Sequence, residues 1–214
     1  MHLLFDLDGT LTDSRPGIIN CIQHALAENG LTAPSAENLL WCIGPPLLES
    51  LKTLVGPASP ELFGPVVEKY RERYGAVGLF ENAVYPEIED ALIELRALGH
   101  TLHVATSKAT VYAQPIIDHF GLATYFVSVN GSELDGTRAN KAELIAHILE
   151  RENILATDVI MIGDREHDMI GAKANGLPAI GVLWGYGSGG ELMESGADAC
   201  VRLPHLLAEM IGSL

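Results

Sequence analysis

The chain of 214 residues is long enough to bury one sizeable hydrophobic core, or a core and a small second domain. Its composition, 48% hydrophobic and 19% charged, excludes a disordered polypeptide. The formal net charge of −15 argues against nucleic-acid and membrane-surface partners, because both carry phosphates and no block of Lys and Arg offsets the acidic residues.

The first predicted element is a short buried strand over residues 3–5, which ends at Asp6. Helical signals then dominate residues 14–84, where we find no good strand. The predicted helices cover residues 18–28, 36–42 and 47–55, and a fourth begins at residue 60. Ser35 and Ser59 are the expected N-caps of the second and fourth helices. This pattern predicts an all-helical insertion about the size of a small domain.

From Tyr85 onward, strands and helices alternate. Strands are expected over 101–106, 126–129, 159–162, 179–183 and 199–201. Helices are expected over 87–98, 111–120, 142–152 and 169–175, with a last helix from Pro204. Pro115 should kink the second of these helices or delay its start. The glycine-rich residues 185–190 form either a mobile surface loop or a border of the functional site.

These elements predict an α/β fold, a doubly wound parallel sheet with an inserted helical domain. We expect residues 1–13 and 85–214 to form the α/β core and residues 14–84 to form a helical cap.

Two acids stand at the end of the first strand, in the sequence Asp6-Leu7-Asp8-Gly9-Thr10. Ligands of open α/β sheets bind outside the carboxyl ends of the strands, so reactive groups belong here. Gly9 permits a sharp bend, and two carboxylates this close call for a cation. An ionised carboxylate can attack without a base. Taken alone, however, such a tetrapeptide is more often a simple turn.

Three further segments carry candidate site residues. Thr106-Ser107-Lys108 follows a predicted strand and could bind phosphate oxygens, and Lys141 opens a predicted helix, whose free amides add to its charge. Asp164 and Asp168 follow the most apolar strand and offer hard oxygen ligands, which suit Mg²⁺ rather than zinc. Each segment could also be purely structural: a Thr-Ser cap, a surface lysine or an acidic turn.

Together, the four segments resemble the four motifs of the haloacid dehalogenase-like hydrolases in order and spacing, and the resemblance covers essentially the whole chain. The helical insertion lies where that family carries its helical cap. Residues 130–138 further resemble the branch of phosphoglycolate phosphatases and small nucleotidases. The resemblance therefore implies a phosphatase that hydrolyses a small-molecule phosphate ester.

The resemblance also implies a role for each site residue. Asp6 would attack phosphorus and form an aspartyl-phosphate, and Asp8 would protonate the leaving oxygen and later activate water. Thr106, Ser107 and Lys141 would hold the phosphoryl group. Mg²⁺ would bind the Asp6 carboxylate, the Asp8 carbonyl and Asp164, with Gly9, Thr10 and Asp168 in support. A cation between an anionic nucleophile and an anionic ester also agrees with general chemistry.

Two alternatives to a phosphatase stay open at this stage. A sugar-phosphate mutase of the β-phosphoglucomutase kind uses the same residues, and a non-catalytic regulatory or binding protein could keep the same fold. Among phosphatase substrates phosphoglycolate leads, and its carboxylate would need a cation from the cap. Arg15 and Lys52 are the best-placed candidates in the sequence.

The remaining expectations concern location and assembly. The first residues show no signal-peptide pattern, and no apolar run is long enough to cross a bilayer. The three cysteines, Cys21, Cys42 and Cys200, are odd in number and lack zinc-site spacing. We therefore expect reduced thiols in a cytoplasmic protein. The sequence does not set the oligomeric state.

Overall fold

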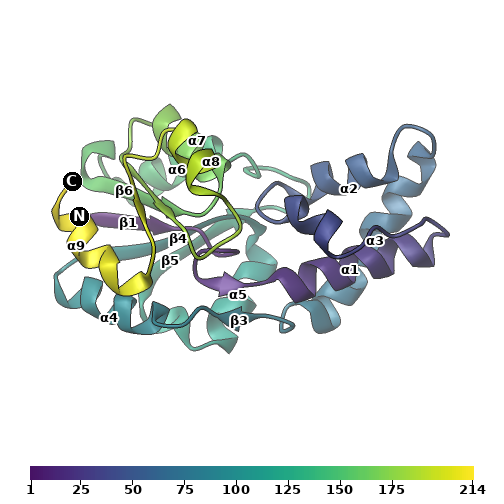
Figure 1. Ribbon diagram of the computed structural model, residues 1–214, viewed down its shortest axis with the longest axis horizontal. Helices are drawn as coiled ribbons and strands as arrows, with labels where there is room; N and C mark the ends of the chain where they lie inside the picture. The colour runs from purple at the N-terminus through teal and green to yellow at the C-terminus, as the bar shows by residue number, and fades with distance from the viewer.

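The computed structural model describes residues 1–214, and its centre is a six-stranded sheet in which every pair of neighbouring strands is parallel. The strands lie in the order β5-β4-β1-β6-β7-β8 (Figure 1). Their bounds are β1 His2–Phe5, β4 Thr101–Ala109, β5 Phe126–Ser132, β6 Val159–Gly163, β7 Ala179–Val182 and β8 Ala199–Val201. The predicted parallel α/β sheet is confirmed.

Helices cover both faces of this sheet, as Figure 1 shows. The bounds are α4 Ile88–Ala97, α5 Thr110–His119, α6 Lys141–Glu152, α7 Glu166–Ala174, α8 Gly189–Glu194 and α9 Leu207–Gly212. Side chains alternate along β1: Leu3 and Phe5 pack in the cluster that contains α4, α5 and α9, and Leu4 packs in the cluster that contains α6, α7 and α8. Because both faces are covered, β6 in the middle of the sheet reads as a continuous apolar run.

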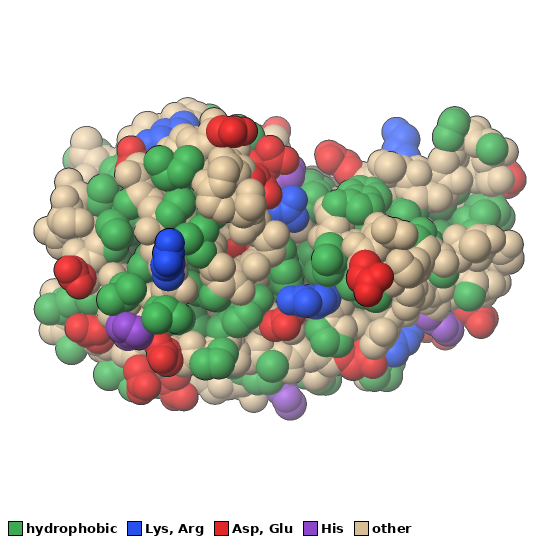
Figure 2. Space-filling model, in the orientation of Figure 1, with side chains coloured by type: hydrophobic (Ala, Val, Ile, Leu, Met, Phe, Trp, Pro, Cys, Tyr) green, Lys and Arg blue, Asp and Glu red, His purple; other side chains and the backbone are tan.

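A smaller helical lobe lies beside the sheet-containing lobe (Figures 1 and 2). It consists of α1 Arg15–Glu28, α2 Leu47–Val55 and α3 Phe63–Arg73, with a 3₁₀ turn at Glu37–Cys42 and a π turn at Tyr74–Gly78. Figure 2 shows that the surface is hollowed where the two lobes meet. None of the helices in the protein combines the length and the apolar character that a bilayer-crossing helix needs.

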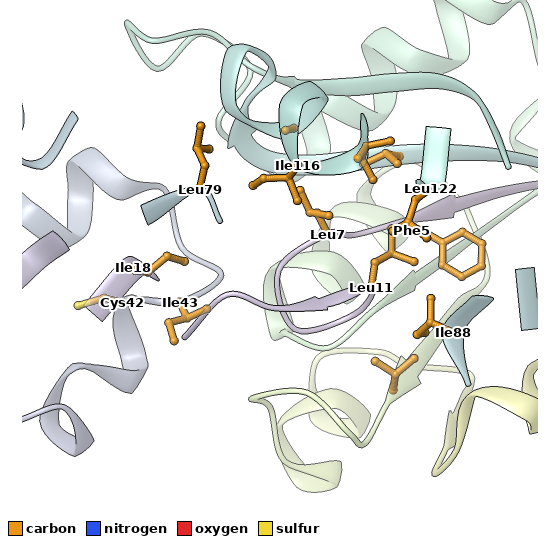
Figure 3. Packing of buried hydrophobic residues seen from close by; sticks show 14 of the residues in the cluster. Phe5, Leu7, Leu11, Ile18, Cys42, Ile43, Leu79, Ile88, Ile116 and Leu122 are labelled. Atoms are coloured by element: carbon orange, nitrogen blue, oxygen red, sulfur yellow. The ribbon is translucent and has the colours of Figure 1, made fainter. Parts of the chain in front are cut away.

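The chain crosses between the lobes twice, and a short two-stranded ladder joins the crossings. In this ladder β2 (Thr12–Asp13) pairs antiparallel with β3 (Ala83–Val84). One hydrophobic cluster of 37 buried residues also continues from one lobe into the other (Figure 3). We propose that the lobes divide at the predicted boundaries, 13/14 and 84/85, because the ladder lies beside both.

Several predicted bounds differ from the structure. The segment after Ser35 forms a 3₁₀ turn instead of an α-helix, and neither Ser35 nor Ser59 caps a helix with its side chain. Pro115 does not delay α5, which already begins at Thr110. The strand predicted to end at residue 106 continues to Ala109, with an irregular register against β5 between Ala105 and Ala109. This irregularity falls within the second candidate motif.

Candidate active site

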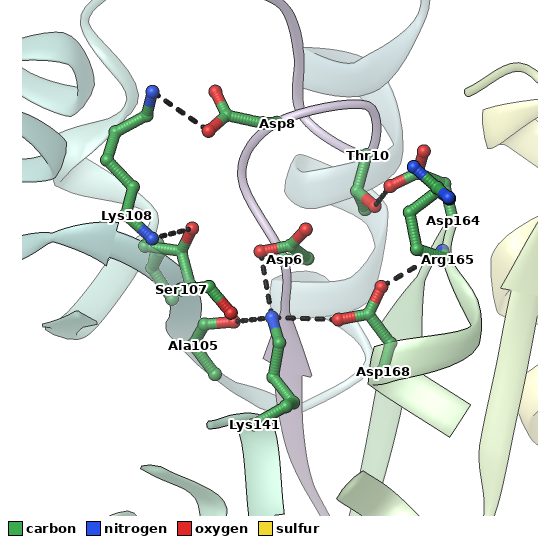
Figure 4. Close-up of polar contacts among 12 residues, drawn as sticks. Asp6, Asp8, Thr10, Ala105, Ser107, Lys108, Lys141, Asp164, Arg165 and Asp168 are labelled. Atoms are coloured by element: carbon green, nitrogen blue, oxygen red, sulfur yellow. Dashed lines mark hydrogen bonds and ion pairs between the residues drawn. The ribbon is translucent and has the colours of Figure 1, made fainter. Parts of the chain in front are cut away.

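The carboxyl ends of three neighbouring strands, β4, β1 and β6, carry the predicted site residues (Figure 4). Asp6 follows β1, and its backbone N–H donates to the Ile162 carbonyl of β6 at 2.9 Å. Asp164 follows β6, and Thr106 lies on the irregular end of β4. Parallel pairing thus brings together residues that are more than 50 positions apart, at the edge where open α/β sheets bind ligands.

Lys141 lies at the centre of the site. Its Nζ is 2.9 Å from Asp6 Oδ1, 2.7 Å from Asp168 Oδ1 and 2.8 Å from the Ala105 carbonyl oxygen. It is the first residue of α6, and the side chain of Asn140 caps that helix by accepting from the amides of residues 142 and 143. A cap that fixes the helix start therefore also fixes where the ammonium group sits.

Asp164 is fully buried, and both its oxygens have donors. Thr10 Oγ1 donates to Oδ1 at 3.3 Å, and the Tyr186 backbone N–H donates to Oδ2 at 2.8 Å. Gly9, with φ of +90°, comes so close that a Cβ there would stand 2.2 Å from Asp164 Oδ2. On the other side, a Cβ at Gly187 would stand 2.0 Å from the Asp164 carbonyl oxygen. Glycine at both positions lets two loops pack against Asp164, one on its carboxylate and one on its backbone carbonyl.

The buried charges shift one another's pKa values. Burial, aided by the charges of Asp168 and Asp6, raises the pKa of Asp164 well above its usual range. Burial also raises the pKa of Asp168, against the opposing effect of Lys141. For Lys141 burial acts to lower the pKa, but the Asp168 and Asp6 carboxylates outweigh it and the pKa is raised. The site thus buries three carboxylates beside one ammonium group that pairs with only two of them, so it is short of positive charge.

This arrangement fits a hard divalent cation. Asp6, Asp164 and Asp168 are buried, and each offers a carboxylate oxygen within 4.8 Å of the others. Such an all-oxygen set suits Mg²⁺ rather than zinc. The Asp8 carboxylate lies outside this cluster. By the family resemblance, the backbone carbonyl of Asp8 would bind the metal, and this role stays a prediction.

Asp8 turns toward a different lysine. Its Oδ2 lies 2.8 Å from Lys108 Nζ, whereas its Oδ1 is buried without a hydrogen-bond partner. Lys108 also donates to the hydroxyl of Tyr74 in the helical lobe, with its Nζ 4.7 Å from the ring centroid. Both side chains of this ion pair are about nine-tenths buried. One residue of the helical lobe therefore holds the lysine that orients Asp8.

A cavity of about 240 Å³ lies above these residues, between the lobes. Asp6, Asp8 and the segment 106–109 line it from the sheet side. The helical lobe contributes Tyr70, Arg71, Tyr74 and the segment 44–49, and Tyr112 of α5 adds a third tyrosine ring. Neither Arg15 nor Lys52 lines this cavity, so the two cations predicted to reach the substrate are not the ones placed there. Arg71 is placed there instead, because α3 turns that side chain toward the sheet lobe.

Several residues that contact the predicted site had no role assigned from the sequence. Lys108 stood inside a motif, but its pairing with Asp8 had no signal in the sequence. Tyr186 lies in the glycine-rich segment 185–190, which borders the site instead of forming a detached surface loop. Arg165 donates from the start of α7 to the Ile43 carbonyl of the helical lobe and pairs with Glu191 at 2.8 Å. Such contacts between distant segments depend on the tertiary fold.

Comparison with known proteins agrees with this geometry. Residues 3–182 match the family described as haloacid dehalogenase-like hydrolase. A 5'-nucleotidase of Pseudomonas aeruginosa is 47% identical over 89% of this chain and 86% of its own. A phosphoglycolate phosphatase of Yersinia pseudotuberculosis is 31% identical over 92% of this chain and 86% of its own. The tyrosine-protein kinase PtkA of Mycobacterium tuberculosis is 39% identical over 86% of this chain, but only 62% of its own length is matched.

A solved structure, that of a predicted phosphatase from Clostridium acetobutylicum, superposes with a TM-score of 0.92 and 41% identity. The match covers 100% of this chain and 98% of that one. It includes both lobes and the site between them. The chain therefore belongs to the haloacid dehalogenase-like hydrolases, and within that family it is a phosphatase, a phosphoric monoester hydrolase.

Proposed function

We propose that the protein hydrolyses a nucleoside 5'-monophosphate to the nucleoside and inorganic phosphate, with Asp6 as nucleophile. The observation that carries this choice is the tyrosine lining of the cavity. Tyr70 and Tyr74 stack with centroids 5.2 Å apart, and Tyr112 meets Tyr74 edge-on at 5.3 Å. A nucleobase is flat, with apolar faces and a polar rim, and aromatic walls suit it. Phosphoglycolate is much smaller and would fill less of this cavity.

The relative that is 47% identical over most of both chains, named a 5'-nucleotidase, supports the same choice. The free cysteines, two buried and one half-buried, support the predicted cytoplasmic location.

In the first half of the proposed reaction, an Asp6 carboxylate oxygen attacks phosphorus and the bond from phosphorus to the nucleoside 5'-oxygen breaks. Lys141 binds Asp6 Oδ1 at 2.9 Å, which leaves the second oxygen for the attack. Asp8 gives its proton to the departing 5'-oxygen. Its Oδ1 is the atom suited to carry that proton, because Oδ2 is occupied by Lys108.

In the second half, water attacks the phosphorus of the aspartyl-phosphate while Asp8 takes its proton. The bond between phosphorus and the Asp6 oxygen breaks, which restores the carboxylate and yields inorganic phosphate. Thr106 and Ser107 hold the phosphoryl oxygens, because they lie beside Asp6 where β4 becomes irregular. Mg²⁺ held by the Asp6 carboxylate, the Asp8 carbonyl and Asp164, with Asp168 in support, would supply the positive charge that the phosphoryl group needs here.

A panel of phosphate esters tests this proposal, with released phosphate as the measurement. Nucleoside 5'-monophosphates should give a higher kcat/KM than phosphoglycolate or sugar phosphates in Mg²⁺, and EDTA should abolish the activity. Ca²⁺ should not replace Mg²⁺, because its larger coordination shell favours bidentate carboxylates and would occupy the attacking oxygen of Asp6. Phosphoglycolate as the best substrate would overturn the nucleotide assignment. Transfer of phosphate between sugar phosphates, in place of its release, would support the mutase alternative.

A further inference from the structure

Arg71 differs from most cations of this acidic protein. The chain has 28 acidic and 13 basic residues, yet no carboxylate oxygen lies within ion-pair distance of the Arg71 guanidinium. Its neighbours on α3, Lys69 and Arg73, are both paired, with Glu72 at 2.8 Å and Glu81 at 2.7 Å. Among the cations without a carboxylate partner, Arg71 is the one that lines the cavity above Asp6.

The Arg71 guanidinium makes one hydrogen bond, but not all of its N–H groups have an acceptor. One terminal nitrogen donates to the Leu134 carbonyl, in the loop between β5 and α6. The Nε–H is buried without an acceptor. A buried donor without a partner is costly, and in native structures it calls for an explanation such as a missing ligand. Arg71 is thus fixed by one contact and keeps donors for another.

The position of Arg71 indicates which part of a substrate it would meet. Leu48, Arg71 and Leu134 line the cavity above Asp6, and the same three residues also line an open hollow next to it. None of the proposed catalytic residues borders that hollow. Arg71 therefore stands at the boundary between the part of the cleft that holds Asp6 and a part that does not. The phosphoryl group already has Thr106, Ser107 and Lys141.

We infer that Arg71 is a specificity-determining residue that donates hydrogen bonds to an acceptor oxygen on the leaving group. This inference rests on the proposed function, in which the acceptor is a carbonyl oxygen on the rim of the nucleobase. The carboxylate of a small acid phosphate offers the same acceptor chemistry, so the experiment includes both. Phenyl phosphate and ribose 5-phosphate carry no carbonyl or carboxylate oxygen on the leaving group, so their hydrolysis should not depend on Arg71.

The test compares Arg71→Met, which keeps the apolar stem, with Lys69→Met on the same helix as matched control. The substrates are uridine 5'-monophosphate, ribose 5-phosphate, phosphoglycolate and phenyl phosphate. In Arg71→Met, kcat/KM for the nucleotide should fall about 10- to 150-fold, mainly through KM. The values for ribose 5-phosphate and phenyl phosphate should stay within about threefold. Arg71→Lys should recover part of the loss, and Lys69→Met should change none of the four.

The outcomes separate this inference from the proposed function. Equal losses on all four substrates would overturn it, since Arg71 would then only position the Leu134 loop. No loss on any substrate would overturn it as well. A selective loss on phosphoglycolate, in an enzyme that does not hydrolyse the nucleotide, would support Arg71 as the acceptor-binding residue and overturn the nucleotide assignment. Melting temperatures of the variants verify that each one is folded.

Discussion

At the scale of single residues, Lys141 balances the charge of the site. It is 4% exposed and touches two carboxylates and a carbonyl oxygen. Buried ion pairs contribute little net stability when complete, because desolvation offsets their attraction. Removing one partner, however, leaves charges that nothing compensates. The stability cost of removing a lysine therefore depends on whether its carboxylate partners remain buried without a cation.

We predict that Lys141→Met lowers the free energy of unfolding by about 3–5 kcal/mol in metal-free buffer. Its loss leaves Asp6 and Asp168 buried without their shared cation. The matched control is Lys173→Met, which breaks an exposed pair with Asp198 and should cost less than about 1 kcal/mol. Urea denaturation of the variants measures both values. If both variants lost the same free energy of unfolding, Lys141 would not be the cation that compensates Asp6 and Asp168.

His103 carries a second prediction at this scale. The side chain is 1% exposed, its Nε2 lies 3.0 Å from His2 Nδ1, and its Nδ1 lies 2.8 Å from Ser128 Oγ. Burial, then the charge of His2, lowers the pKa of His103 from 6.5 to about 4, against a weak opposing effect of Glu152.

Because the unfolded chain takes up this proton at a higher pH than the folded protein, the contribution of His103 to the free energy of unfolding should fall as pH drops from about 6.5 to about 4. The contribution of this one group is about 2–4 kcal/mol. In His103→Asn that part of the pH dependence should disappear, which urea titrations at several pH values would detect. Parallel curves for wild type and variant across this window would refute it.

At the scale of elements, the sequence predicted strands better than helix starts. The strand after residue 158 was predicted correctly, because burial on both faces leaves an unbroken apolar run. Helix starts were less predictable. Ser35 and Ser59 have the right residue type for a cap, but the turns that follow them are 3₁₀, and neither side chain reaches a backbone amide. Asn140 caps α6 with its side chain, although no cap was predicted at that position.

The loop between β7 and α8 shows what composition could not decide. Its glycines fit either a mobile surface loop or a border of the site, and the structure places Tyr186 against Asp164. The glycines are needed for close approach: at Gly187 a side chain would collide with the Asp164 carbonyl oxygen. No property of residues 185–190 alone reveals that neighbour, because it comes from another strand end.

We predict that Gly187→Ala lowers kcat at least about 10-fold and stability by about 1–3 kcal/mol, since the added Cβ must displace backbone beside Asp164. Gly190→Ala is the matched control. It lies in α8, where the nearest atom to an added Cβ is 3.8 Å away, and alanine should be neutral or slightly stabilising there. Phosphate-release kinetics and melting temperatures compare the two. Similar behaviour of both variants would mean that the close approach at residue 187 does not hold the site.

At the scale of the whole molecule, the sequence predicted the sheet, the helical lobe and the meeting of distant residues at one edge. That last prediction was possible because parallel strands bring their carboxyl ends to the same side. What it could not predict is the contact between lobes. Arg15 and Lys52 were the cations predicted to reach the substrate, yet α3 places Arg71 at the cavity. The contact of Tyr74 with Lys108 likewise depends on how the lobes pack.

A formal charge of −15 opposes the approach of an anionic phosphate ester, yet the protein is a phosphatase. The structure reconciles the two by burying its critical charges. Within the site Lys141 pairs with two carboxylates and Lys108 with one, and the acidic cluster offers ligand oxygens for a divalent cation. The positive charge that attracts the substrate is therefore local and does not depend on the surface average.

The central claim, that Asp6 is the nucleophile, is tested most directly by Asp6→Asn. This variant keeps the shape of the side chain and removes the negative charge that attacks phosphorus. Phosphate release should fall by about 10⁴-fold or more on every substrate, because no covalent intermediate can form. Its circular dichroism and cooperative unfolding should remain those of a folded protein. If the folded variant kept more than about a tenth of wild-type activity, the aspartyl-phosphate mechanism would be wrong.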